Sequence, residues 1–154
     1  MKKLISVIAA ITAIFAPITA ITEGGEYFIL CKPGSTVNAR ISPRKSAEVV
    51  GWLECGDAVK TDGKQKNGYV HIIDCSMECS EAWISSRYLV KDQPITCYIQ
   101  TTVIGNGKVK SRNYVNGKTV HRLKPNTAVT IYAYSEEWCA TNKGYIQTQY
   151  LGVN

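Results

Sequence analysis

The sequence predicts an all-β fold made of two similar units in tandem. Short runs rich in Val, Ile, Tyr and Trp are separated by clusters of Gly, Asn, Asp and Pro, at the spacing of a small barrel or sandwich. The clearest runs are 27–30, 69–73, 127–134 and 144–148. After the N-terminal apolar segment, no stretch keeps an apolar period of 3.6 residues over three turns, so we expect little helix.

An internal repeat is the second observation behind this fold class, since self-similarity indicates architecture before any single motif does. Shifted by seventy residues, VVGWLECGDAVKT falls on TVHRLKPNTAVTI with its apolar skeleton kept, and residues 39–40 fall on residues 109–110. Further along, GYVHI matches EWCAT, with Tyr69 on Trp138, and AWISSRYLV matches GYIQTQYLG, with Trp83 on Tyr145. The offset shrinks along the way, so the first copy carries an insertion at 74–81.

The first twenty residues have the order of a secretory signal peptide. Lysines at positions 2 and 3 precede an apolar run that ends in Ala-Pro-Ile-Thr-Ala at 16–20. We expect cleavage after Ala20; an uncleaved anchor is the alternative, although the run before Pro17 is short for a bilayer. The expected domains are 1–20 (signal peptide), 21–90 (first unit), 91–94 (linker) and 95–154 (second unit). Such a protein is secreted, with no membrane contact after cleavage.

Six cysteines enter an oxidising space in such a protein, where thiols pair. They allow three disulfides and leave fifteen connectivities open: Cys31, Cys55, Cys75, Cys79, Cys97 and Cys139. Four lie in the first unit and two in the second, so pairing within each unit favours Cys97 with Cys139. In the insertion, Cys75 pairs with Cys79, or one of them pairs with Cys55 or Cys31.

VNARISPRKSAEVVGWLECGDAV, residues 37–59, resembles the opening of the bacterial Src-homology-3-like (SH3b) domain. The family's closing motif, Gly-Trp-Val-x-x-x-Tyr-Leu, is matched by residues 82–89 and again by 144–151. The resemblance implies two small SH3-like β-barrels in tandem after the signal peptide. It also implies a non-catalytic module that binds peptidoglycan or another cell-wall polymer. The second copy departs from the opening motif at 107–110, which weakens any transfer of binding residues to it.

Candidate ligand contacts in the first unit are Asn38, Arg40, Trp52 and Tyr69. Asn38 and Arg40 flank Ala39 in an alternating strand, so they share a face and could hold a peptide carboxylate or carbonyl. The alternative is that Arg40 only braces the turn after it. Trp52 is replaced by a charged residue in the second copy, which predicts an exposed position. Trp83 and Tyr145, by contrast, are expected in the cores because each precedes an Ile in a strand.

The second unit is the basic one. Residues 91–154 hold eight Lys and Arg against three Asp and Glu, whereas residues 21–90 hold eight against nine. Lys108, Lys110 and Arg112 alternate along one strand, and such a cationic face suits the phosphates of teichoic acid. A solvated strand face with no ligand gives the same pattern.

Enzyme activity, nucleic-acid binding and cofactors are not expected. A cysteine hydrolase needs a histidine near its thiolate, and the histidines are His71 and His121, the second of which is predicted in a surface turn. His71, Cys75 and Cys79, with Cys55, could ligate zinc, but their spacing is unusual and export favours disulfides, so we expect no metal. The main alternative to a cell-wall ligand is a secreted protein partner, with this chain acting as an interaction or inhibitor module.

Overall fold

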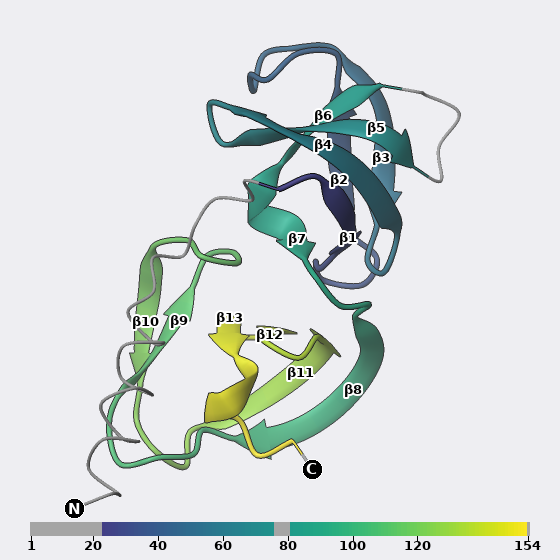
Figure 1. The fold of residues 1–154 in the computed structure, drawn as a ribbon. Helices are drawn as coiled ribbons and strands as arrows, with labels where there is room; N and C mark the ends of the chain where they lie inside the picture. Colours follow the sequence, from purple (N-terminus) through teal and green to yellow (C-terminus); the bar gives the residue numbers. More distant parts are fainter. Residues whose placement is uncertain (1–22, 76–80, 154) are drawn as a thin grey trace, which may run out of the picture.

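The computed structural model describes residues 23–75 and 81–153 (Figure 1). The predicted signal peptide and most of the insertion, including Cys79, lie outside the described residues. Within the described ranges, no helix is long and apolar enough to cross a membrane.

Two antiparallel sheets make up the fold, which confirms the all-β prediction. The first sheet has the strand order β3 (Val49–Glu54), β2 (Thr36–Arg40), β6 (Ala82–Ser85), β5 (Tyr69–Cys75), β4 (Ala58–Lys66), β1 (Gly25–Ile29) and β7 (Leu89–Val90). The second has the order β10 (Thr119–Leu123), β9 (Val109–Arg112), β13 (Gly144–Gln147), β12 (Trp138–Thr141), β11 (Ala128–Tyr134) and β8 (Ile95–Thr102). One-turn 3₁₀ helices, η1 (Ser86–Tyr88) and η2 (Thr148–Tyr150), follow β6 and β13.

The repeat in the sequence is also a repeat of topology. Strands β3, β2, β6, β5, β4 and β1 take the same places in the first sheet that β10, β9, β13, β12, β11 and β8 take in the second. Figure 1 shows the two curved sheets one above the other, with the chain passing from β7 into β8.

Strand register corrects one detail of the repeat. Leu53 lies opposite Val37 and Leu123 lies opposite Val109, so Arg40 corresponds to Arg112 and not to Lys110 as the sequence alignment predicted. The segment between β2 and β3 is two residues longer than the one between β9 and β10. The alignment kept the same offset of seventy residues across this turn, and it was therefore wrong for residues 39–40.

Each sheet buries its own apolar cluster. In the first, Leu53, Ile72 and Ile84 are at most 1% exposed, and in the second Ile131 and Ile146 are fully buried. These residues alternate with outward-facing ones along their strands, as expected for sheets with one buried face. Full burial of each such side chain contributes about 1.5–3 kcal/mol.

A third apolar cluster, which we call the seam, joins the two sheets. Leu30 and Val90 from the first half pack with Trp138 and Ala140 from the second, and all four are at most 6% exposed. The hydroxyl of Tyr145 donates to the carbonyl of Leu30 at 3.3 Å. The two halves are therefore packed against each other through buried surface as well as connected by the chain.

Candidate functional site on the outer face of the first sheet

Three neighbouring strands of the first sheet place a row of side chains on its outer face. Trp83 on β6 lies opposite Arg40 on β2 and opposite His71 on β5. Its neighbours Ala82 and Ile84 are buried in the core, so the strand turns Trp83 outward, where it is partly exposed. The prediction that Trp83 belongs to the core is thus wrong.

Asp62 completes this row because β4 is irregular next to it. The pairing of β4 with β5 shifts between Thr61 and Gln65, and Gly63 within that bulge has φ +84°. The amide of Gly63 donates to the hydroxyl of Thr61 at 3.0 Å and fixes the local turn. Bulges commonly redirect a side chain, and this one turns Asp62 toward His71. We refer to Arg40, Trp83, His71 and Asp62 as the outer row.

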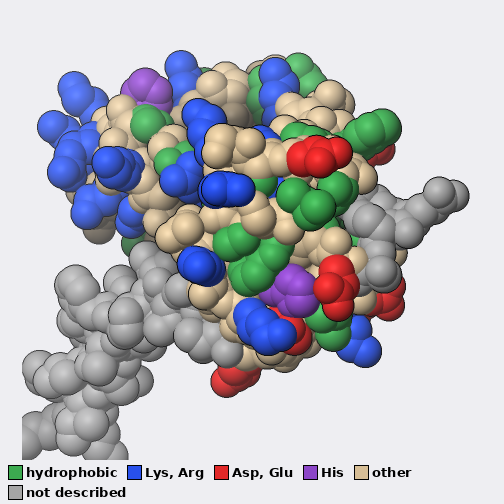
Figure 2. Space-filling model, turned by 90° about the horizontal axis from the view of Figure 1, so that it is seen from above, with side chains coloured by type: hydrophobic (Ala, Val, Ile, Leu, Met, Phe, Trp, Pro, Cys, Tyr) green, Lys and Arg blue, Asp and Glu red, His purple; other side chains and the backbone are tan. Residues whose placement is uncertain are grey.

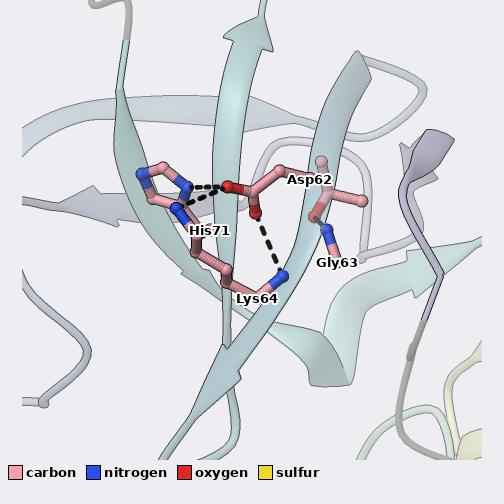
Figure 3. A network of polar contacts seen from close by, with 5 residues as sticks. Asp62, Gly63, Lys64 and His71 are labelled. Carbon is pink, nitrogen blue, oxygen red and sulfur yellow. Dashed lines mark hydrogen bonds and ion pairs between the residues drawn. The ribbon is translucent and has the colours of Figure 1, made fainter.

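The Asp62 carboxylate is held from three directions (Figure 3). Its Oδ1 accepts the Lys64 amide at 3.0 Å, and its Oδ2 lies 2.9 Å from Nδ1 of His71 and 3.2 Å from Nζ of Lys64. Partial desolvation opposes the charged carboxylate, but these three partners outweigh it and lower the pKa of Asp62 to about 2. The carboxylate therefore stays ionised, and keeps its hold on His71, at any pH above about 2.

This arrangement orients an imidazole next to an aromatic surface. A carboxylate can only accept, so the hydrogen bond to Asp62 places a proton on Nδ1 of His71, and in the neutral imidazole Nε2 is then an acceptor. The ring of His71 lies 4.9 Å from the ring of Trp83 at 45°. A histidine held by a carboxylate needs a nucleophile beside it for acyl transfer, and an indole is not one. The outer row offers stacking and hydrogen bonding.

Arg40 has a structural task as well as a place in the row. Its guanidinium donates to the carbonyl of Ala47 at 2.7 Å, which braces the turn between β2 and β3. Arg112 does the same in the second half, where it donates to the carbonyl of Gly117 at 2.7 Å. Arg40 thus braces the turn after it, and Arg112 shares that role; a ligand contact by Arg40 stays a prediction.

The other predicted contacts of the first half extend the same face. Trp52 is 62% exposed, as predicted, and lies opposite the exposed Asn38 on the edge pair β3 and β2. Tyr69 is partly exposed and precedes His71 by two residues on β5; by the strand register it flanks the outer row on the same side as Asn38 and Trp52. Asn38 and Trp52 are therefore neighbours, whereas Tyr69 is separated from them by β6.

The equivalent face of the second half is covered. Trp138, Ala140 and Tyr145 occupy the strand positions that Tyr69, His71 and Trp83 occupy in the first half, because each set pairs across β12–β13 or β5–β6 in the same way. All three contribute to the seam. Tyr145 is accordingly not in the core of its own sheet, which corrects that prediction, and its burial, with Cys31 and Tyr88 nearby, raises the pKa of its hydroxyl.

Lys108, Lys110 and Arg112 do alternate along β9 and the residue before it, with Lys110 exposed. Lys110 lies directly opposite Arg122 on the edge strand β10. Among the described residues, Asp62 forms an ion pair with Lys64 and a hydrogen bond with His71, and neither Lys110 nor Arg122 has an acidic partner. His121 is exposed on β10 and not in a turn as predicted. Figure 2 shows Lys and Arg side chains gathered on one side of the molecule.

Cys97 and Cys139 both pack in the core of the second sheet, on β8 and β12, with β11 between these strands. They are not bonded to each other in the structure, and their pairing stays a prediction. The thiol of Cys139 lies 3.4 Å from the hydroxyl of Thr148, and burial raises its pKa to about 11.

The structure describes three of the four residues of the zinc alternative, namely Cys55, His71 and Cys75. His71 is held by Asp62, and Cys79 lies outside the described residues. Within the part of the chain that is described, no group of three or more His, Cys, Asp and Glu side chains has the geometry to hold a metal ion.

Sequence reasoning missed the roles of Asp62 and Trp83, and considered His71 as a metal ligand or as the histidine of a cysteine hydrolase. An Asp-Gly pair in the middle of a polar strand was the available signal, because Gly inside a strand often marks a bulge. Nothing in the sequence indicated which copy would leave its outer face open.

No protein-family model matches the chain, and no curated protein matches it. Among solved structures, it is similar to NlpC1 from Trichomonas vaginalis, with a TM-score of 0.36 and 22% identity over 88% of this chain and 48% of that one. It is also similar to NlpC2 from Trichomonas vaginalis, with a TM-score of 0.35 and 18% identity over 88% of this chain and 50% of that one. The chain thus spans about half the length of these two proteins.

Proposed function

We propose that this protein is a secreted, non-catalytic binding module built from two SH3-like barrels, and that it recognises peptidoglycan or another cell-wall polymer. The observation that carries the proposal is the contrast between two equivalent faces. In the second half the aromatic face is buried in the seam, whereas in the first half it stays partly exposed and carries Trp83 with polar groups fixed around it.

An open aromatic face with fixed polar groups suits a polymer of sugars and short peptides. Indole faces stack on sugar rings, and their flat surface is gained at low entropic cost. Nε2 of His71 and the amide of Asn38 supply hydrogen bonds to hydroxyls or carbonyls on either side of the Trp83 ring. Trp52, at the edge of the sheet, lengthens the face in the direction of β3.

Co-sedimentation with purified peptidoglycan sacculi tests the proposal. We expect the wild type to bind, and Trp83→Ala and Trp52→Ala each to bind at least about tenfold more weakly, as for exposed aromatic anchors elsewhere. Tyr98→Ala is the control, because Tyr98 is 76% exposed on β8, away from the outer row. Equal binding by the three variants would contradict the assigned face, and absence of binding by the wild type would contradict the ligand class.

Basic residues of the second half are proposed to add attraction to teichoic acid. Like charges opposite each other on paired strands repel, so Lys110 and Arg122 cost stability where they stand. Lys110→Glu is expected to raise the free energy of unfolding by about 0.2–1 kcal/mol through a new pair with Arg122. It should also weaken binding to sacculi that carry teichoic acid, most clearly at low salt.

The matched control for Lys110→Glu is Lys45→Glu, which makes the same charge change at an exposed site between β2 and β3. Urea unfolding and sedimentation across a salt series measure both effects. If Lys45→Glu weakens binding as much as Lys110→Glu, net charge and not the β9–β10 pair attracts the polymer.

A protein partner is the second candidate. The β2–β3 hairpin exposes four large apolar side chains, Ile41 (62%), Val49 (43%), Val50 (38%) and Trp52 (62%). Contiguous exposed apolar surface commonly marks a protein-binding site. If the wild type does not sediment with any wall preparation, a protein partner becomes the favoured ligand.

A further inference from the structure

We propose that Cys31 and Cys55 form a thiol–disulfide site: Cys55 reacts with small-molecule disulfides such as oxidised glutathione, and Cys31 then closes the intramolecular bond. Both residues carry thiols in the structure. This inference is independent of the polymer-binding proposal.

Backbone pairing brings together the segments that carry the two cysteines. In the antiparallel pair of β1 and β4, Glu26 lies opposite Lys60 and Phe28 lies opposite Ala58. At the end of this pair, the amide of Ile29 donates to the carbonyl of Asp57 at 3.0 Å and the amide of Gly56 donates to the carbonyl of Ile29 at 2.8 Å. The chain turns there, with the amide of Asp57 donating to the carbonyl of Glu54 at 3.2 Å, so Cys55 lies in a turn beside the strand end that leads to Cys31.

Both side chains belong to the same apolar cluster, in which Cys31 is buried and Cys55 packs against it; a disulfide joins two such cysteines when their Cα atoms lie within about 7 Å. By the repeat, the corresponding residues of the second half are Gly105 and Pro125, neither of which can form such a bond. The pair is therefore a feature of the first half alone.

The surroundings give the two sulfurs different tasks. Cys31 is 3% exposed, and its thiol donates to the carbonyl of Ser35 at 3.7 Å, whereas Cys55 is partly exposed. The nearby Cys31 lowers the pKa of Cys55, whereas the nearby Cys55 together with burial raises the pKa of Cys31. The thiolate is the nucleophile in thiol–disulfide exchange, so Cys55 is the residue that attacks first.

The reaction balances with a disulfide as oxidant. The Cys55 thiolate attacks one sulfur of oxidised glutathione, which forms a mixed disulfide and releases one glutathione thiolate. Cys31, after losing its proton to solvent, attacks the Cys55 sulfur and releases the second glutathione. Two protein thiols are oxidised to one disulfide, and one oxidised glutathione is reduced to two thiols.

The site lies at the margin of the seam. Cys55 packs against the seam cluster, and the nearby Thr96 at the start of the second half helps to lower the pKa of its thiol. Leu30, the neighbour of Cys31, is part of the seam and accepts the Tyr145 hydroxyl. A bond between the cysteines would thus fix the segment of the first half on which the second half rests.

Peptide mapping of the full-length protein tests the inference. The protein is equilibrated in a glutathione redox buffer, quenched with acid, alkylated, digested and analysed by mass spectrometry. We expect a cross-linked pair of peptides that contain Cys31 and Cys55. Their connection to other cysteines in the folded protein, or their persistence as free thiols in oxidised glutathione, would overturn the proposal.

Two variants test the order of the steps. Cys31→Ser should accumulate glutathione on Cys55, because the resolving thiol is absent, whereas Cys55→Ser should leave Cys31 unmodified. Glutathione on Cys31 in the second variant would overturn the assigned order. Cys97→Ser is the control and should leave the cross-link unchanged. Because the wild-type map needs no substitution, the test stands even if a variant does not fold.

Oxidation of the wild type should also raise its melting temperature by about 10 °C, as expected for closing a loop of this length in a protein of this size. If the cross-link forms and the melting temperature does not change, then Cys31 and Cys55 are not positioned in the folded protein to form an unstrained disulfide.

Discussion

Trp138→Ala is expected to lower the free energy of unfolding by about 3–5 kcal/mol, the usual cost of emptying a buried tryptophan site. Trp138 is 3% exposed and packs in the seam with Leu30 and Val90. Its removal leaves a cavity between the two halves that neither sheet can close by itself. We therefore expect the halves to unfold in separate steps, as uncoupled units do.

Urea unfolding followed by tryptophan fluorescence and by far-UV circular dichroism measures this result, because the two signals separate when unfolding ceases to be two-state. Trp52→Ala is the matched control. Trp52 is 62% exposed, so its loss should change stability by about 0.5 kcal/mol or less. Similar losses for both tryptophans would show that the seam does not couple the halves.

Gly144→Ala is the second substitution with a large expected effect. Gly144 begins β13 with φ +100°, and a Cβ built on it lies 2.6 Å from the carbonyl oxygen of Arg112. The contact is with backbone, so no side chain can rotate away to relieve it. Strain in this backbone region costs about 1–3 kcal/mol before the clash is added, so we expect a loss of at least about 2 kcal/mol.

Thermal unfolding of Gly144→Ala checks this expectation against Gly107→Ala. Gly107 has no heavy atom within 4 Å of a built Cβ and has no positive φ, so alanine fits there without strain. Because Gly144 precedes Tyr145, we also expect the Tyr145 hydrogen bond to Leu30 to weaken. A small effect at Gly144, equal to that at Gly107, would mean that the β12–β13 turn relaxes freely.

Much of the fold could be predicted from the sequence because alternation and turn residues are local signals. They placed strands at Tyr69 and Gly144 and showed that Asn38 and Arg40 share a face. The exposure of Trp52 was predictable because its repeat is Arg122, and a position that accepts a charge rarely lies in a core.

Alternation does not say which of two faces is the buried one. On β6 the small Ala82 and the branched Ile84 fill the core, and the larger Trp83 lies outside, although its size and apolar character favoured the reverse. A core already filled by residues such as Leu53 and Ile72 has no room for an indole. The sequence analysis therefore did not predict Trp83, the central residue of the candidate site, on the outer face.

The remaining features depend on contacts between distant parts of the chain. The seam joins Leu30 and Val90 to residues 115–145, and no periodic pattern connects those segments. The bulge at Asp62 was visible only as an Asp-Gly pair, and its consequence for His71 depends on the register of β4 against β5. Strand register and long-range packing depend on the whole fold, so local sequence patterns do not predict them.

The seam also decides how many ligands one molecule can hold. Two copies of a binding unit in one chain ordinarily give avidity on a repetitive polymer, because the second contact is intramolecular. Here the aromatic face of the second copy is buried against the first copy. Under the proposed function, the protein is therefore monovalent toward its glycan or peptide target. Such a molecule coats a polymer at one site per chain and does not cross-link neighbouring strands.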